Sequence, residues 1–97
     1  MAAYIIAEVE VTDPDGYERY KPIVQQTLGK YGGRFLVRGG AAEALEGAAP
    51  KRVVVLEFTD AKSARAWYHS EEYAPGLKLR LAAARSRLIL AEGVPPG

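Results

Sequence analysis

The stretch that decides the fold is residues 52–60, which read Arg-Val-Val-Val-Leu-Glu-Phe-Thr-Asp. Most of residues 52–58 are β-branched or aromatic, as is typical of a strand. The polar pair Thr59 and Asp60 follows at once, and such side chains commonly cap the first turn of a helix. The sequence therefore predicts a strand at 52–58 and a helix from there to about Ser70.

A similar succession occurs earlier in the chain, where residues 10–13 (Glu-Val-Thr-Asp) match residues 57–60 (Glu-Phe-Thr-Asp). Residues 4–11 predict the strand of this first unit. Asp13 can accept a hydrogen bond from the first helical amides, and Pro14 suits the first helical position. The helix that follows is predicted over 15–30, because bulky side chains recur at three- and four-residue steps: Tyr17, Tyr20, Val24, Leu28 and Tyr31.

The remaining chain completes two such units. The pattern predicts a second strand at 34–38, a loop at 41–50, a helical segment at 71–84 bent near Pro75, and a last strand at 86–92. The order β-α-β-β-α-β predicts an α+β fold of the ferredoxin-like type, in which both helices cover one side of a four-stranded antiparallel sheet. We assign a single domain to residues 1–93 and a C-terminal tail to residues 94–97.

Composition excludes several classes of function. With 97 residues the chain has room for one core, and its net charge of +1 argues against a strong nucleic-acid footprint. It contains no Cys, which excludes disulfides and thiolate sites, and its single His leaves too few ligands for most transition metals. No apolar run approaches the roughly 18 residues of a membrane span, and no secretion signal follows Met1. We therefore expect a cytoplasmic protein that binds neither nucleic acid nor membrane.

Alternation along the predicted strands separates two faces of the sheet. One face is apolar and suits packing under the helices: Ile5, Ala7, Val9, Val11, Val54, Leu56 and Phe58. The other face mixes aliphatic side chains with carboxylates: Tyr4, Ile6, Glu8, Glu10, Val53, Val55 and Glu57. Because Phe35 and Val37 belong under the helices, Arg34 and Arg38 are predicted on the carboxylate side.

This mixed face is too apolar to stay in water and too charged for an ordinary core. It predicts a symmetric homodimer in which a second copy of the chain covers the face. The alternative is a solvated face with surface ion pairs, each contributing under about 1 kcal/mol. Ion pairing with Arg34 or Arg38 is also favoured over binding of a hard cation by Glu8, Glu10 and Glu57, so no metal site is predicted.

A few side chains are candidates for a site. His69 has an unperturbed pKa near neutrality, so either His69 or Glu57 is the candidate catalytic base. Arg38 is the candidate to bind a carboxylate or enolate oxygen, with Glu57 holding the arginine in place, while Trp67 and Tyr73 wall the cleft. The alternative interpretation is structural, with His69 at a helix C-terminus and the aromatic rings in the core. No phosphate loop or nucleophile elbow accompanies them, so no cofactor is predicted.

Four segments stand out together: residues 31–40 (Tyr-Gly-Gly-Arg-Phe-Leu-Val-Arg-Gly-Gly), Asp13-Pro14 with Tyr17 and Tyr20, residues 55–58, and residues 66–70 with Glu72 and Tyr73. With these segments the chain resembles the small bacterial domain-of-unknown-function 1330 family, from about Tyr4 to Gly93. The resemblance implies a dimeric α/β-barrel, in which two ferredoxin-like subunits join sheet to sheet. It implies no particular reaction.

Wider relatives of that barrel include cofactor-free monooxygenases, polyketide cyclases, muconolactone isomerases and haem-dependent chlorite dismutases, which share only the fold. This chain contains no Asn, the residue with which the cofactor-free monooxygenases hold an oxyanion, and its His follows no haem motif. Our leading hypothesis is a homodimer that binds a small organic anion between helices and sheet. The alternatives are a cofactor-free proton-transfer enzyme of isomerase or cyclase type, and a structural or regulatory dimer without a ligand.

Overall fold

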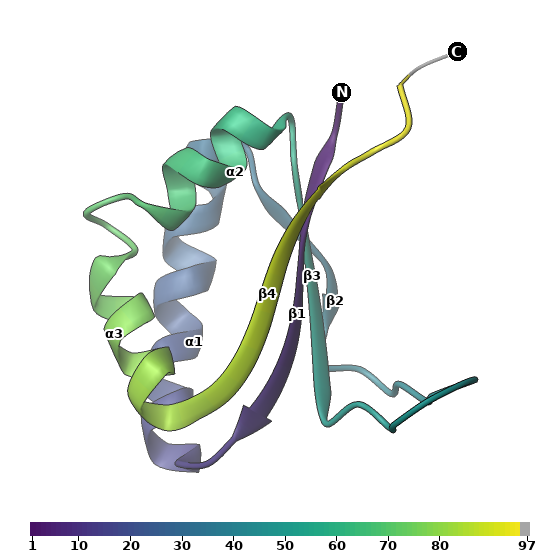
Figure 1. The fold of residues 1–97 in the computed structure, drawn as a ribbon. Helices are drawn as coiled ribbons and strands as arrows, with labels where there is room; N and C mark the ends of the chain where they lie inside the picture. The colour runs from purple at the N-terminus through teal and green to yellow at the C-terminus, as the bar shows by residue number, and fades with distance from the viewer. Residues whose placement is uncertain (96–97) are drawn as a thin grey trace.

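The elements follow the predicted order β-α-β-β-α-β in the computed structural model, which describes residues 1–95, with the second helical unit in two pieces. They are β1 (Ala3–Val11), α1 (Pro14–Leu28), the 3₁₀ helix η1 (Gly29–Tyr31), β2 (Arg34–Arg38), β3 (Arg52–Phe58), α2 (Ala61–Tyr68), α3 (Ala74–Ala83) and β4 (Ala84–Glu92). The strands pair antiparallel in the order β2-β3-β1-β4. The helices α1, α2 and α3 cover one face of the sheet (Figure 1), so the ferredoxin-like prediction is confirmed.

The predicted boundaries hold for β2 and β3 and shift elsewhere. The second helical unit divides at Ser70, whose hydroxyl donates to the Trp67 carbonyl at 2.7 Å and accepts the Tyr73 amide at 3.1 Å. Strand β4 begins earlier than predicted, at Ala84. Of the predicted tail, residues 94–95 carry no regular structure and residues 96–97 lie outside the described residues. Among residues 1–95, no helix is long and apolar enough to cross a membrane.

The two predicted helix caps have different outcomes. Asp60 caps α2 as predicted, because its carboxylate accepts the Ser63 amide at 2.7 Å. The prediction for Asp13 is wrong, since its side chain makes no capping hydrogen bond. The backbone of Asp13 begins α1 instead: its carbonyl accepts the Tyr17 amide at 3.0 Å, and its amide donates to the Ala83 carbonyl at 2.9 Å. The start of α1 is therefore tied to the end of α3.

The core lies between the sheet and the helices and is rich in aromatic rings. Trp67, Tyr73 and Phe58 are its largest fully buried side chains. The Trp67 ring centre lies 4.1 Å from that of Tyr73 and 5.7 Å from that of Phe58. The predicted apolar face of the first strand is confirmed, since Ile5 and Val9 are buried beneath the helices.

A bulge in β2 changes the face on which Arg38 lies. Phe35 and Arg38 both pair with residues on the helix-facing side of β3, whereas strict alternation would place them on opposite sides. Arg38 therefore lies on the helix side. Arg34, before the bulge, lies on the outer face and forms a 2.6 Å ion pair with Glu57. The predictions that both arginines share the carboxylate side and that Glu57 holds Arg38 are therefore wrong.

The outer face of the sheet, away from the helices, is mixed as predicted. Ile89 and Val37 are exposed aliphatic side chains on this face. The prediction that Val37 lies under the helices is wrong, because the bulge in β2 turns it outward. Beside them, Arg87 of β4 lies 3.5 Å from the Glu8 carboxylate of β1. Exposed pairs of this kind contribute little to stability on their own.

Candidate functional site

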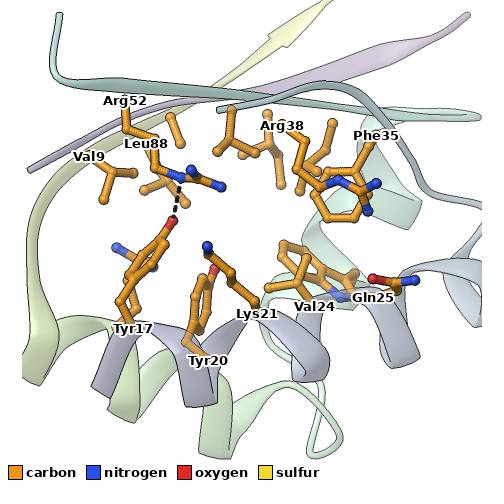
Figure 2. A pocket seen from close by; sticks show the side chains of 16 residues that line it. Val9, Tyr17, Tyr20, Lys21, Val24, Gln25, Phe35, Arg38, Arg52 and Leu88 are labelled. Atoms are coloured by element: carbon orange, nitrogen blue, oxygen red, sulfur yellow. Dashed lines mark hydrogen bonds between the residues drawn. The ribbon is translucent and has the colours of Figure 1, made fainter. Parts of the chain in front are cut away.

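A cavity of about 350 Å³ lies between α1 and the helix-facing side of the sheet (Figure 2). Small-molecule sites in proteins span about 300 to 1,000 Å³, so the cavity is large enough for a small ligand. The cavity is lined by Ile5, Ala7, Val9, Tyr17, Tyr20, Lys21, Val24, Gln25, Phe35, Arg38, Arg52, Val54, Leu56, Trp67, Arg80 and Leu88.

The charged side chains that line this cavity are all basic: Lys21, Arg38, Arg52 and Arg80. Lys21 pairs with Glu18 at 2.8 Å, whereas none of the three arginines forms a salt bridge within residues 1–95. In the same part of the chain, no group of three His, Asp or Glu side chains could hold a metal ion. The charge of the lining favours an anion.

Arg80 is the buried cation of the cavity and is only 4% exposed. Its Nη1 donates to the Ser86 hydroxyl at 2.7 Å, but its Nε has no hydrogen-bond partner among residues 1–95. A buried charge without a counter-charge and a buried donor without an acceptor both cost stability. An anion bound beside Arg80 would neutralise the charge.

Arg52 packs on the aromatic wall that α1 contributes. Its guanidinium lies 5.4 Å from the centre of the Tyr17 ring, and its Nε donates to the Tyr17 hydroxyl at 3.2 Å. Gly39 makes room for this arrangement, because a Cβ at that position would clash with Nη1 of Arg52. Gly39 also has a φ of +71°, a conformation that glycine adopts at low cost.

Replacing Gly39 with alanine is expected to displace the Arg52 side chain and to strain the backbone. We expect the free energy of unfolding to fall by about 1–2 kcal/mol, the cost of a left-handed conformation for alanine. Urea denaturation followed by circular dichroism measures the loss. Gly40→Ala is the matched control, since a Cβ at Gly40 meets nothing within 4 Å. Equal losses in the two variants would contradict this role of Gly39.

Arg38 lines the cavity and is exposed. Its guanidinium is 4.7 Å from the centre of the Phe35 ring, and Figure 2 shows Gln25 of α1 across from this pair. Stacking on the ring limits the motion of the side chain and leaves its N–H groups free to bind oxygen atoms.

Tyrosine and tryptophan rings form the deeper wall. The Tyr20 hydroxyl is hydrogen-bonded to the Tyr73 hydroxyl at 2.8 Å. Burial, helped by Tyr73, raises the pKa of Tyr20 far above its ordinary value, so Tyr20 stays protonated and does not serve as a base. The Trp67 ring is held in place by Nε1, which donates to the Thr27 hydroxyl at 2.9 Å.

The structure places the predicted site residues in different parts of the molecule. Arg38 and Trp67 line the cavity, and Tyr73 is fully buried behind the lining. Glu57 lies on the outer face of the sheet. His69 is exposed at the end of α2, in a second hollow beside β4. Neither predicted base lines the cavity, and the catalytic roles of His69 and Glu57 stay predictions.

Several residues that line the cavity were not predicted from the sequence. Arg52 alternates with Val54, Leu56 and Phe58, so the strand pattern was sufficient to place it on the helix-facing side. Tyr17, Lys21 and Gln25 recur at four-residue steps, which places them along one stripe of α1. No local signal marks Arg80, because an arginine in a helix is ordinarily exposed.

Three solved structures are similar to this chain over nearly its whole length. RPA0582, a protein of unknown function from Rhodopseudomonas palustris, has a TM-score of 0.80 at 18% identity, and the matched region covers 98% of this chain and 84% of the RPA0582 chain. A dimeric ferredoxin-like protein of unknown function from Jannaschia sp. CCS1 has a TM-score of 0.72 at 15% identity, covering 96% and 100%. SnoaB, a cofactor-independent oxygenase from Streptomyces nogalater, has a TM-score of 0.64 at 16% identity, covering 99% and 98%. At these identities the likeness shows the fold alone.

Sequence comparison is more specific about the family. No curated protein matches this sequence. The family model that matches covers residues 2–94 and describes a domain of unknown function, DUF1330, which confirms the resemblance seen in the segments above. The chain therefore belongs to the DUF1330 family.

Proposed function

We propose that this protein binds a small organic anion with a planar body in the cavity between α1 and the sheet. The observation that carries the proposal is the charge of the lining, in which all the charged side chains are basic. Buried charges in proteins are ordinarily paired. Arg80 is buried and forms no salt bridge among residues 1–95, so it lacks the anionic partner that a buried arginine ordinarily has.

The chemistry of the lining favours a carboxylate or an enolate as the anionic group. Guanidinium groups present several N–H donors in one plane, which matches the geometry of a carboxylate. Aromatic side chains from α1, α2 and β2 line the same space and favour a flat, conjugated body: Tyr17, Tyr20, Trp67 and Phe35.

Replacing Arg38 with glutamine is expected to weaken binding of 2-naphthoate about tenfold or more, because a hydrogen bond to a charged group contributes about 1.5–3 kcal/mol. Isothermal titration calorimetry measures the affinity. Arg34→Gln is the matched control, because it removes the same charge from the same strand on the opposite face of the sheet. We expect Arg34→Gln to bind as the unchanged protein does.

The neutral analogue 2-naphthamide separates charge from shape. It has nearly the same body as 2-naphthoate, and we expect the unchanged protein to bind it at least about tenfold more weakly. Equal affinities for the two compounds would overturn the proposal of an anion site. So would equal losses in the Arg38→Gln and Arg34→Gln variants.

We also propose that a second copy of the chain covers the outer face of the sheet. Exposed aliphatic side chains, Val37 and Ile89 among them, lie on that face. The loop between β2 and β3 extends away from the helices on the same side (Figure 1) and carries Leu45, which is 89% exposed. The similar protein from Jannaschia is dimeric, which further supports the proposal.

Native mass spectrometry is expected to show a dimer at micromolar concentration. Ile89→Glu places a charge in the covered face and should shift the protein to the monomer. Leu81→Glu is the control, since Leu81 is 67% exposed on α3, on the helix side of the sheet. If the unchanged protein is a monomer at this concentration, the proposal that a second copy covers the outer face of the sheet is wrong.

A further inference from the structure

We infer that the ligand is a dianion, with one oxyanion group at each end of the cavity and a planar apolar body between them. This inference rests on the proposed anion site and adds the class of ligand. It comes from the distribution of the arginines, which gather at two separated ends of the lining.

One end is formed by Arg52 and Arg80. In the sheet, Val9 of β1 is the direct partner of Arg52 on β3 and of Ser86 on β4. Arg80 of α3 donates to the Ser86 hydroxyl at 2.7 Å. Arg52 and Arg80 therefore approach the cavity at the same level of the sheet, on either side of Val9.

The other end is formed by Arg38. Its guanidinium rests on the ring of Phe35, and Phe35 pairs with Leu56 of β3. Arg38 itself is on β2, whereas Ser86, which accepts the hydrogen bond from Arg80, is on β4. Strands β3 and β1 lie between β2 and β4, so at about 4.8 Å between neighbouring strands these two strands are about 14 Å apart. Figure 2 shows Arg52 above Tyr17 at one side of the cavity and Arg38 beside Phe35 at the other.

The middle of the cavity is suited to an apolar body. Val24 of α1 lies between the two ends in Figure 2, and the Trp67 ring lines the cavity as well. A carboxylate is far smaller than the separation of the two ends, so one such group cannot bind both. A monoanion bound at Arg38 would leave Arg80, 4% exposed, without a counter-charge.

A pair of aromatic acids tests this inference. Naphthalene-2,6-dicarboxylate has two carboxylates at opposite ends of a flat body, and its monomethyl ester keeps the body with only one charge. Calorimetry is expected to show that the dicarboxylate binds at least about tenfold more tightly than the ester. Equal affinities of the diacid and the ester, both above that of the neutral dimethyl ester, would overturn the dianion and leave the anion site standing. Equal affinities of all three compounds would overturn both.

Variants identify the two ends. Arg38→Gln and Arg52→Gln should each reduce the preference for the diacid over the monomethyl ester to about twofold or less, because each removes one charge-assisted contact. Arg34→Gln, on the outer face, should keep the full preference. Thermal unfolding followed by circular dichroism checks that every variant is folded. If Arg38→Gln and Arg52→Gln keep the full preference, the two-ended site is wrong.

Discussion

Replacing Arg80 with methionine is expected to stabilise the protein and, at the same time, to abolish most of its affinity for an aromatic carboxylate. The two effects have one cause. Arg80 is 4% exposed and has no salt bridge within residues 1–95. Burial disfavours this charge, and the neutral hydroxyls of Ser86 and Tyr73 offset that cost in the empty protein without supplying the counter-charge that a bound anion would. Methionine keeps the apolar stem and removes the charge.

The expected gain in the free energy of unfolding is about 1–2 kcal/mol, in the range found when buried charged groups are replaced by apolar ones. It is reduced by the lost hydrogen bond to Ser86. The expected loss of affinity for naphthalene-2,6-dicarboxylate is about 100-fold, since removing one member of a buried charge pair costs about 2–5 kcal/mol. Urea denaturation and calorimetry give the two numbers.

Lys78→Met is the matched control for this prediction, because Lys78 is an exposed cation on the same helix. It should change neither the stability nor the affinity appreciably. An Arg80→Met variant that is less stable and binds naphthalene-2,6-dicarboxylate as well as the unchanged protein would show that Arg80 has a purely structural role.

Trp67→Ala is expected to lower the free energy of unfolding by about 3–5 kcal/mol, the usual cost of removing a large buried aromatic side chain. The Trp67 ring is 1% exposed and packs between Tyr73 and Phe58, with centre distances of 4.1 Å and 5.7 Å. The substitution also leaves the Thr27 hydroxyl without the indole N–H that donates to it. A domain of this size has a total stability of about 5–15 kcal/mol, so the variant should be close to unfolding.

Far-UV circular dichroism in urea is the suitable measurement, because Trp67 is the only tryptophan and its fluorescence is lost with it. Trp67→Phe should cost less than Trp67→Ala, since most of the ring contacts remain. Leu45→Ala, at a position that is 89% exposed, should cost almost nothing. A loss of less than about 1 kcal/mol in Trp67→Ala would contradict the central place given to this ring.

The elements of the fold were predictable because their signals are local. Strands β2 and β3 have the predicted bounds. The stripe of Tyr17, Tyr20, Val24 and Leu28 is buried as its spacing indicates. The second helical unit divides at Ser70 as predicted, but its second piece begins at Ala74 rather than at residue 71. That later start was not predicted, because it depends on a single hydroxyl, that of Ser70, bonding to the backbone on both sides.

The candidate site was only partly predictable. Arg38 and Trp67 line the cavity as predicted, but Arg38 does so from the face opposite to the expected one. The bulge that moves Arg38 arises where β2 pairs with β3. Neither the residue types nor the spacing within the five residues of β2 indicate it. Glu57 and His69 were candidates for a catalytic base because of their residue type alone, and residue type does not determine which cavity a side chain lines.

By itself, the sequence determined the order of the elements, the class of the fold and the family, because hydrophobic period, turn residues and family segments are all properties of neighbouring residues. Only the tertiary structure decided the site. It brings Arg52 of β3, Arg80 of α3 and Tyr17 of α1 to one end of a cavity and sets Arg38 at the other. That convergence depends on strand register and on how α3 packs against the sheet, and both are set by contacts between residues far apart in the chain.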